Sequence, residues 1–191
     1  MASDNSYLYH RLRSLILPLY QIDQELPKKG KITELGCGQG IISKYLSKEK
    51  KREITGIDMD KKRIPKFSNS NLKFKVADIT KIKYPKQDAF VISDVLHHLS
   101  HKDQKNLLSN IFKSTNKNGF LVIKEIDAED FLRSKLSRFW DFIFYPKDRI
   151  SYQKSSELKK YLRKLGFDVN VKKACQLFPG STILFVCKKN G

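Results

Sequence analysis

The sequence contains few cysteines, and Cys37, Cys175 and Cys187 lie far apart without forming a C-x-x-C pair. An odd number of widely spaced cysteines argues against a disulfide framework and against a zinc finger. The sequence also lacks a run of about 18 apolar residues, so no segment is expected to span a membrane. No apolar stretch followed by a small-residue cleavage site marks a secretory signal at the N-terminus. The expected location is therefore the cytoplasm.

Acidic residues are also scarce, because 20 Asp and Glu stand against 38 Lys and Arg, which gives a formal net charge of +18. Such a surface attracts anions, including nucleic acid, anionic lipid headgroups and phosphorylated small molecules. Alternatively, the charge only solubilises the surface, since the lysines recur along the chain and flank apolar runs. A length of 191 residues and an apolar fraction of 40% predict one globular domain.

Short apolar runs rich in β-branched and aromatic residues alternate with helical patterns. Strands are expected over residues 31–35, 53–58, 72–78, 88–94 and 119–125. Helices are expected over residues 40–51 and 101–119, and Gly119 supplies the stop of the second helix. Strand then helix, repeated, predicts an α/β fold with a doubly wound, mostly parallel sheet and helices on both faces.

The C-terminal third adds a helix over residues 155–167, with Gly166 as its C-terminal cap. Two further strands are expected over residues 167–174 and 181–189. The turn-like FPGS between them is too short for a crossover helix, so the two strands should pair antiparallel.

Two segments lie outside this scheme. Leucines and isoleucines recur at helical spacing over residues 8–26, and Pro18 should kink or split that helix. Residues 129–152 hold seven aromatic side chains, including the only Trp, interleaved with Lys and Arg. This aromatic stripe either packs against the sheet and closes the core, lines an apolar acceptor pocket, or rests on an anionic membrane surface.

The stretch ITELGCGQG, residues 32–40, places three glycines on alternate positions between an expected strand and an expected helix. A dinucleotide-binding fingerprint, G-x-G-x-x-G, would need Gly at position 41, which is Ile41. Glu34, just before the glycines, would repel a pyrophosphate. It would suit a ligand that carries a cation, such as an ammonium or a sulfonium.

Five motifs follow one another in register: ELGCGQG at 34–40, GIDMD at 56–60, VADIT at 76–80, ISDVLHHL at 92–99 and KNGFLVIKE at 117–125. With these motifs the chain resembles the class I S-adenosylmethionine (AdoMet)-dependent methyltransferases, in particular small methyltransferase-domain proteins that act on small molecules and lipids. The resemblance covers residues 30–127 strongly and the C-terminal part by architecture. It implies a Rossmann-like sheet of seven strands ending in an antiparallel hairpin, with AdoMet as cofactor and S-adenosylhomocysteine as product.

A single methyltransferase domain over residues 1–191 is therefore expected. Its parts are a helical cap (1–28), an AdoMet-binding core (29–127), an aromatic and basic insert (128–152) and the C-terminal helix and hairpin (153–191).

The resemblance implies a role for each residue of the first motif. Glu34 would lie near the methionine ammonium of AdoMet, as a charge-assisted contact. Gly36, Gly38 and Gly40 would let the loop pass under the cofactor, with Cys37 as a small side chain among them. Without such a ligand, these glycines would only turn the chain into a helix.

The next motifs would hold the adenosine. Asp58 would accept hydrogen bonds from both ribose hydroxyls, and Met59 would pack on the adenine. Asp78 would accept from the exocyclic amine, and the Ile79 amide would meet a ring nitrogen. Alternatively, Asp58 caps a helix and Asp78 is an isolated turn residue.

Ser93 and Asp94, at the end of the fourth strand, would border the methionine part and the reacting methyl. AdoMet is intrinsically reactive, so such an enzyme mainly aligns the acceptor and excludes water. A base is needed only where the acceptor must lose a proton.

His97 and His98 are the candidates for that base, and with Asp94 they form the expected catalytic set. In phosphobase methyltransferases, a His four residues past such an Asp pairs with an N-terminal Tyr, and His98 matches that His. The tyrosines available for this pairing are Tyr7, Tyr9 and Tyr20. Alternatively, one histidine packs under the loop and the other is solvated.

No metal is expected, because His97 and His101 lack a Cys or a third His beside them. Nucleic-acid base methylation is disfavoured, because residues 93–96 read SDVL in place of an Asn/Asp-Pro-Pro-aromatic motif. No cysteine lies there for cytosine C5 chemistry, and no RNA-binding module is visible.

The expected partner is a small acceptor, lipid-like or phosphorylated, methylated on O or N, with a peripheral contact to an anionic membrane as a further option. The alternatives are an RNA or protein methyltransferase recruited by charge, and a non-catalytic AdoMet-binding protein. The sequence leaves the oligomeric state open.

Overall fold

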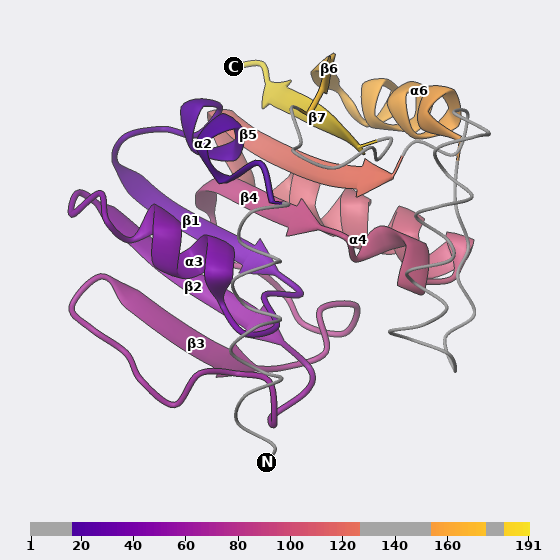
Figure 1. Ribbon diagram of the computed structural model, residues 1–191. Helices are drawn as coiled ribbons and strands as arrows, with labels where there is room; N and C mark the ends of the chain where they lie inside the picture. The colour runs from indigo at the N-terminus through magenta and orange to yellow at the C-terminus, as the bar shows by residue number, and fades with distance from the viewer. Residues whose placement is uncertain (1–16, 127–153, 175–181) are drawn as a thin grey trace.

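The computed structural model describes residues 17–126, 154–174 and 182–191 (Figure 1). The predictions for Tyr7 and Tyr9, for the insert at 128–152 and for the turn at 178–181 lie outside these residues. No helix within the described ranges is long and apolar enough to cross a membrane.

The described residues form one seven-stranded sheet in the order β3-β2-β1-β4-β5-β7-β6. Strands β1 to β5 pair parallel, whereas β7 runs antiparallel to both β5 and β6. This arrangement confirms the predicted mostly parallel sheet with a C-terminal antiparallel hairpin. The strands are β1 (Gly30–Leu35), β2 (Arg52–Asp58), β3 (Leu72–Val76), β4 (Gln87–Ser93), β5 (Thr115–Ile126), β6 (Phe167–Lys173) and β7 (Thr182–Lys189).

Helices cover both faces of the sheet (Figure 1). The short helices α2 (Leu19–Gln24) and α3 (Ile41–Leu46) pack on one face, in a core that includes Ile32, Val91 and Val122. Helices α4 (His101–Ser114) and α6 (Ser155–Leu165) pack on the other, against Leu35, Ile92 and Ile123. Side chains alternate between faces along each strand, so neighbouring residues in one strand belong to different cores.

Two helix ends agree with their sequence signals and one does not. Helix α2 begins directly after Pro18, and α6 ends at Leu165 with Gly166 as its C-terminal cap, whose φ of 108° is left-handed. The predicted stop of the second core helix at Gly119 is wrong, because α4 ends at Ser114 and β5 begins at Thr115. Gly119 lies instead in an irregular part of β5, where an added Cβ would come within 2.9 Å of the Asp88 carbonyl oxygen.

The predicted alternation of strand and helix does not hold for the two connections to the edge strand β3. In the described structure, no helix lies between β2 and β3 or between β3 and β4. Strand β3 is an edge strand that ends at Val76, earlier than expected, and its Lys73 and Lys75 are exposed. Lysines on an edge strand disfavour pairing with another chain.

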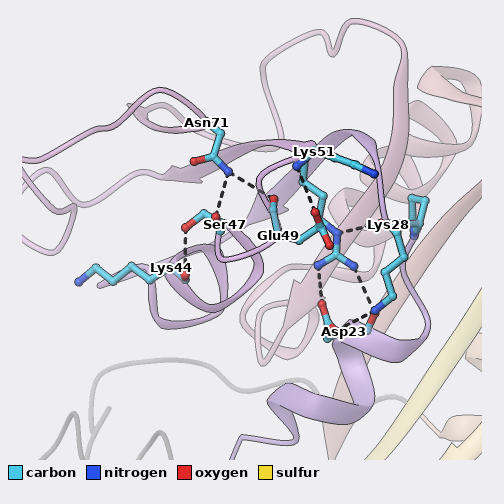
Figure 2. A network of polar contacts seen from close by, with 9 residues as sticks. Asp23, Lys28, Lys44, Ser47, Glu49, Lys51 and Asn71 are labelled. Atoms are coloured by element: carbon cyan, nitrogen blue, oxygen red, sulfur yellow. Dashed lines mark hydrogen bonds and ion pairs between the residues drawn. The ribbon is translucent and has the colours of Figure 1, made fainter.

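Polar contacts fix the amino ends of the strands (Figure 2). The Arg52 side chain, fully buried at the start of β2, donates to the Asp23 carboxylate on α2 and to the Pro27 carbonyl at 2.8 Å. Asn71, just before β3, donates to the Ser47 carbonyl at 2.9 Å. These contacts hold the edge of the sheet opposite the loops that follow the strands, which carry the candidate site.

Candidate active site

The glycine loop between β1 and α3 requires its glycines for the backbone conformation itself. Gly36, Gly38 and Gly40 have φ values of 73°, 51° and 71°, in the left-handed region that glycine enters without a Cβ penalty. An added Cβ at Gly36 would lie 2.3 Å from Val95 Cγ2, and one at Gly40 would lie 2.6 Å from the Phe74 ring. The loop is therefore both left-handed and tightly packed.

A buried carboxylate joins this loop to the end of β2. Asp58 is 7% exposed, and its Oδ2 accepts from the Gly38 amide at 2.7 Å. Its Oδ1 accepts from the Asp60 amide at 2.9 Å, in a turn rather than at a helix start. A carboxylate has about four lone-pair sites, so two amides leave it able to accept from a ligand hydroxyl.

Glu34 lies on the same side of the sheet and is 3% exposed. Its Oε2 accepts from both the Ser43 amide, at 2.8 Å, and the Ser43 hydroxyl. Glu34 therefore contacts the first turn of α3, and it also lines a cavity over the glycine loop. The sequence did not predict the contact with Ser43.

A cavity opens over the glycine loop. It is lined by Glu34, by residues 36–39 of the loop and by Ser93, and Arg63 from the β2–β3 connection joins them, whereas Gly40 and Asp58 are not among the lining residues. A Cβ added at Gly38 would lie 3.2 Å from an Arg63 guanidinium nitrogen, so this cation lies against the loop. The lining residues are Leu17, Glu34, Gly36, Cys37, Gly38, Gln39, Ile41, Ile42, Arg63 and Ser93.

Cys37 is a buried part of this loop. It is 6% exposed, and burial together with the charges of Glu34 and Asp58 raises the pKa of its thiol. A thiol that stays protonated is a poor nucleophile, which agrees with its interpretation as a small packing side chain.

Asp78 and Ile79 follow β3 and lie outside the residues that line this cavity. Asp78 Oδ1 accepts from the Thr80 hydroxyl at 2.7 Å and from its amide at 2.9 Å, while Oδ2 lies 3.0 Å from Lys81 Nζ. These contacts lower the pKa of Asp78 to about 2, and the hydrogen bond from the Thr80 hydroxyl contributes most. Asp78 thus shapes the turn in which the Ile79 side chain is buried.

Met59, the residue expected to pack on an adenine, directly follows β2 and is 73% exposed. A side chain so placed is accessible to a ligand beside Asp58.

The loop after β4 is held by the next strand. Asp94 has a left-handed φ of 56°, which is uncommon for a residue with a Cβ. Its two carboxylate oxygens lie 2.6 and 2.8 Å from Nζ of Lys124, which is 5% exposed near the end of β5. Ser93, the residue before Asp94, is buried as well.

The neighbouring residue of β5 holds the same loop from the other face. Glu125 Oε1 accepts from the amides of Val95 and Leu96, at 3.2 and 2.9 Å, and Oε2 lies 2.7 Å from His97 Nδ1. His97 is 4% exposed, and its ring centroid lies 4.3 Å from that of His98. His97 therefore packs under the loop, as one of the predicted alternatives had it, while His98 is less buried.

Lys124 and Glu125 were missed by the sequence analysis, although one signal was present. Two charged residues follow the apolar run at 120–123 in β5, and the carboxyl end of a buried strand is where functional side chains collect. Within the described part of the chain, no group of three or more His, Cys, Asp or Glu residues could hold a metal ion.

The sequence matches a family model described as a methyltransferase domain over residues 4–171. No curated protein matches the sequence. Solved structures with the same fold include human N-acetylserotonin methyltransferase in complex with SAM, with a TM-score of 0.72 and 20% identity over 94% of this chain. This chain spans about half of that protein (51%), and a similar share (56%) of an O-methyltransferase family protein from Burkholderia thailandensis.

Two archaeal structures match over nearly their whole length. A SAM-dependent methyltransferase from Archaeoglobus fulgidus has a TM-score of 0.75 and 17% identity, covering 97% of this chain and 100% of that one. The putative methyltransferase solved with the Haloferax volcanii activator Trm112 has a TM-score of 0.77 and 12% identity, covering 94% of this chain and 92% of that one. At these identities the similarity shows a shared fold.

Proposed function

The chain belongs to the methyltransferase-domain family, and on that premise we propose that it transfers the methyl group of AdoMet to oxygen or nitrogen of a small acceptor that is lipid-like or anionic. The observation that carries the proposal is the left-handed glycine loop bonded to buried Asp58, with Glu34 in the same cavity. The proposal is supported by two buried carboxylates, Asp58 and Glu34, at or near the carboxyl ends of adjacent strands, where open α/β sheets bind ligands.

In this proposal, the residues at the ends of β1, β2 and β3 hold the donor. Asp58 receives the ribose hydroxyls, Glu34 lies near the methionine ammonium, and the glycine loop passes beneath. Met59, Asp78 and the Ile79 amide take the adenine. The bound donor supplies a methyl group on a sulfonium, which is reactive without further activation.

The loop after β4 belongs to the acceptor side. Ser93 and Asp94 border the reacting methyl, and His97 and His98 remain the candidates for a base or an acceptor-orienting group. Because Glu125 contacts His97, His98 is the better candidate of the two. Residues 1–16 and 128–152, which lie outside the described structure, are proposed to select the acceptor.

Calorimetry with AdoMet and S-adenosylhomocysteine tests the donor site, followed by transfer of a labelled methyl group to O- and N-acceptors. We expect both ligands to bind, and Asp58→Ala to weaken both. Absence of binding by the folded wild-type protein, with no change on substitution of Asp58, would refute the proposal.

A second candidate is transfer to RNA or protein, which the net charge of +18 favours. Anion-driven binding of RNA weakens steeply with salt, since each neutralised phosphate releases a counterion. Labelled AdoMet offered with total RNA at low and high salt would distinguish this candidate, because methyl transfer to a small acceptor depends little on ionic strength.

A further inference from the structure

We propose that the Lys124 ammonium binds the acceptor oxygen, and that the acceptor is an acid with an O–H group, a phenol or a carboxylic acid, bound as its anion. This inference rests on the proposed methyltransferase function and narrows the acceptor from O or N to an acidic oxygen. It concerns Lys124 in the motif KNGFLVIKE, to which no role was given in the donor site.

The position of Lys124 follows from strand alternation. Ile32, Val91 and Val122 lie in one core on the α3 face, so the residues two places further along each strand face the same side. Those residues are Glu34, Ser93 and Lys124. Strands β1, β4 and β5 are consecutive in the sheet, and Ser93 is directly opposite Lys124 in the register. Glu34 pairs with Val91, which pairs with Val122, so Lys124 lies two strands away and two residues further along. With strands about 4.8 Å apart and a rise of about 3.3 Å per residue, the two positions are separated by roughly 12 Å.

The order of the strands in the sheet also separates the site of the methyl donor from that of the methyl acceptor. The sheet runs β2-β1-β4-β5, and the donor residues proposed above end β2 and β1. The reacting methyl then lies near the end of β4, and the space beyond it is above the end of β5. Lys124 is therefore on the acceptor side of the methyl group.

Burial makes Lys124 unusual. Lysines are rarely buried unless they are paired, and Lys124 is 5% exposed with both contacts on Asp94. A buried ion pair seldom adds stability over apolar residues of similar size, because desolvation offsets the attraction. Its presence at the ligand-binding edge of the sheet is better explained by a role toward a ligand.

The hydrogen-bonding capacity of Lys124 points the same way. An ammonium has three N–H donors, and within the described residues Asp94 is its one acceptor. Asp94 is itself held in a left-handed conformation, with its amide bonded to the Lys124 carbonyl at 3.0 Å. Backbone strain of this kind collects at functional sites. Asp94 thus holds the Lys124 ammonium in place through two of its N–H groups and leaves the third for a bound oxygen.

The chemistry balances without a side-chain base. The acceptor O–H loses its proton to solvent on binding, because a nearby cation favours the anion. The anionic oxygen then forms the O–CH3 bond as the S–CH3 bond breaks, the bonding pair moves to sulfur, and S-adenosylhomocysteine leaves. A protonated amine would be repelled by the same ammonium, so amine acceptors are disfavoured.

The test uses 4-nitrophenol, whose anion absorbs visible light, added to the protein saturated with S-adenosylhomocysteine at a pH below the phenol's own pKa. We expect the bound phenol to ionise in the wild type and in Lys124→Arg. In Lys124→Met, the affinity for the anion should fall about 10- to 100-fold, as expected for a charge-assisted hydrogen bond. Asp94→Asn should bind the anion more tightly, because it leaves the ammonium without a counter-charge.

The controls separate this inference from the general proposal. Lys172→Met removes an exposed lysine that pairs with Glu25, and it should change nothing. The other charged or titratable groups near the site are Glu34, Asp58 and Arg63 around the glycine loop and Glu125, His97 and His98 around the loop after β4, and all of them stay in place in every variant. If S-adenosylhomocysteine does not bind, the proposed function fails. If it binds, but the wild type takes up 4-nitrophenol no better than neutral 4-nitroanisole, or Lys124→Met behaves as wild type, the inference about Lys124 is wrong.

Discussion

The backbone amide of Gly38 donates to Oδ2 of Asp58 across 2.7 Å, although the two residues are 20 positions apart. The other oxygen of Asp58 accepts from the Asp60 amide at 2.9 Å. One buried carboxylate therefore fixes the loop after β1 to the end of β2. Any change at Asp58 acts on the glycine loop and on the proposed ribose contact at once.

Substitution of Asp58 is expected to weaken the donor site strongly. Asp58→Ala removes the acceptor for Gly38 and, in our proposal, for the ribose hydroxyls. Hydrogen bonds to charged groups contribute about 1.5–3 kcal/mol each, so the affinity for S-adenosylhomocysteine should fall about 10-fold to 100-fold or more. Isothermal calorimetry measures this, and Asp58→Asn should give an intermediate loss.

Asp60→Ala is the matched control, because Asp60 follows in the same turn and its carboxylate accepts from the Lys62 amide at the surface. It should leave the affinity within about twofold. Equal losses in Asp58→Ala and Asp60→Ala would contradict a specific role for Asp58.

Gly36 provides a separate test of the loop. Gly36→Ala places a side chain at a left-handed φ, which costs about 1–3 kcal/mol, and forces its Cβ toward Val95 Cγ2. Urea denaturation should show the loss of stability. Adding Val95→Ala should restore the stability lost to the clash with Val95, but not the stability lost to the left-handed backbone. The double variant should therefore be more stable than the summed losses of the two single variants predict. Strict additivity would show that Val95 moves aside without cost.

The glycine loop and Asp58 could be predicted from the sequence because their signal is local. The glycines are adjacent in the chain, and an acidic residue at the end of an apolar strand is recognisable in one dimension. The contact between Glu34 and Ser43 was missed because it depends on how α3 approaches the sheet.

Lys124 and Glu125 were missed for a similar reason. The contacts of these two residues with the loop after β4 depend on the register between β4 and β5. They also depend on which face of the sheet each side chain lies on, since Lys124 and Glu125 lie on opposite faces. The absence of a helix between β2 and β3 could be predicted from the sequence, since Pro65 and the polar residues after it disfavour a helix. The stop at Gly119 was misread because glycine in a strand irregularity and glycine at a helix end look alike in sequence.

Acid should weaken the contact that holds α2 to the sheet. Burial acts to raise the pKa of Asp23, but hydrogen bonds from Arg52 and Lys28 outweigh it and leave the pKa below its usual value. Because the folded-state pKa is lower, Asp23 adds stability above its unfolded value of about 4, and this stability is lost as the pH falls through the folded pKa.

Asp23→Asn should therefore lower the free energy of unfolding at neutral pH by up to about 3 kcal/mol, because it leaves the buried Arg52 charge unpaired. The wild type and the variant should converge in strong acid. Lys28→Ala, which removes an exposed partner of the same carboxylate, should cost less than about 1 kcal/mol. A gap between wild type and Asp23→Asn that persists unchanged in acid would contradict this account.

Glu125 should be a structural support of the loop after β4. Glu125→Ala removes the acceptor for two buried amides, those of Val95 and Leu96, and for the His97 ring, so we expect a loss of about 3 kcal/mol or more in urea denaturation. Glu125→Gln keeps a carbonyl oxygen for the amides but faces His97 with a different group, so ring nitrogen NMR should show a changed His97 tautomer. Affinity for S-adenosylhomocysteine should stay within about twofold in Glu125→Gln, since this variant keeps an acceptor for the Val95 amide and Val95 packs against Gly36. Glu157→Ala, at an exposed site on α6, is the control for loss of a carboxylate. Wild-type stability in Glu125→Ala would show that the loop holds its conformation without this contact.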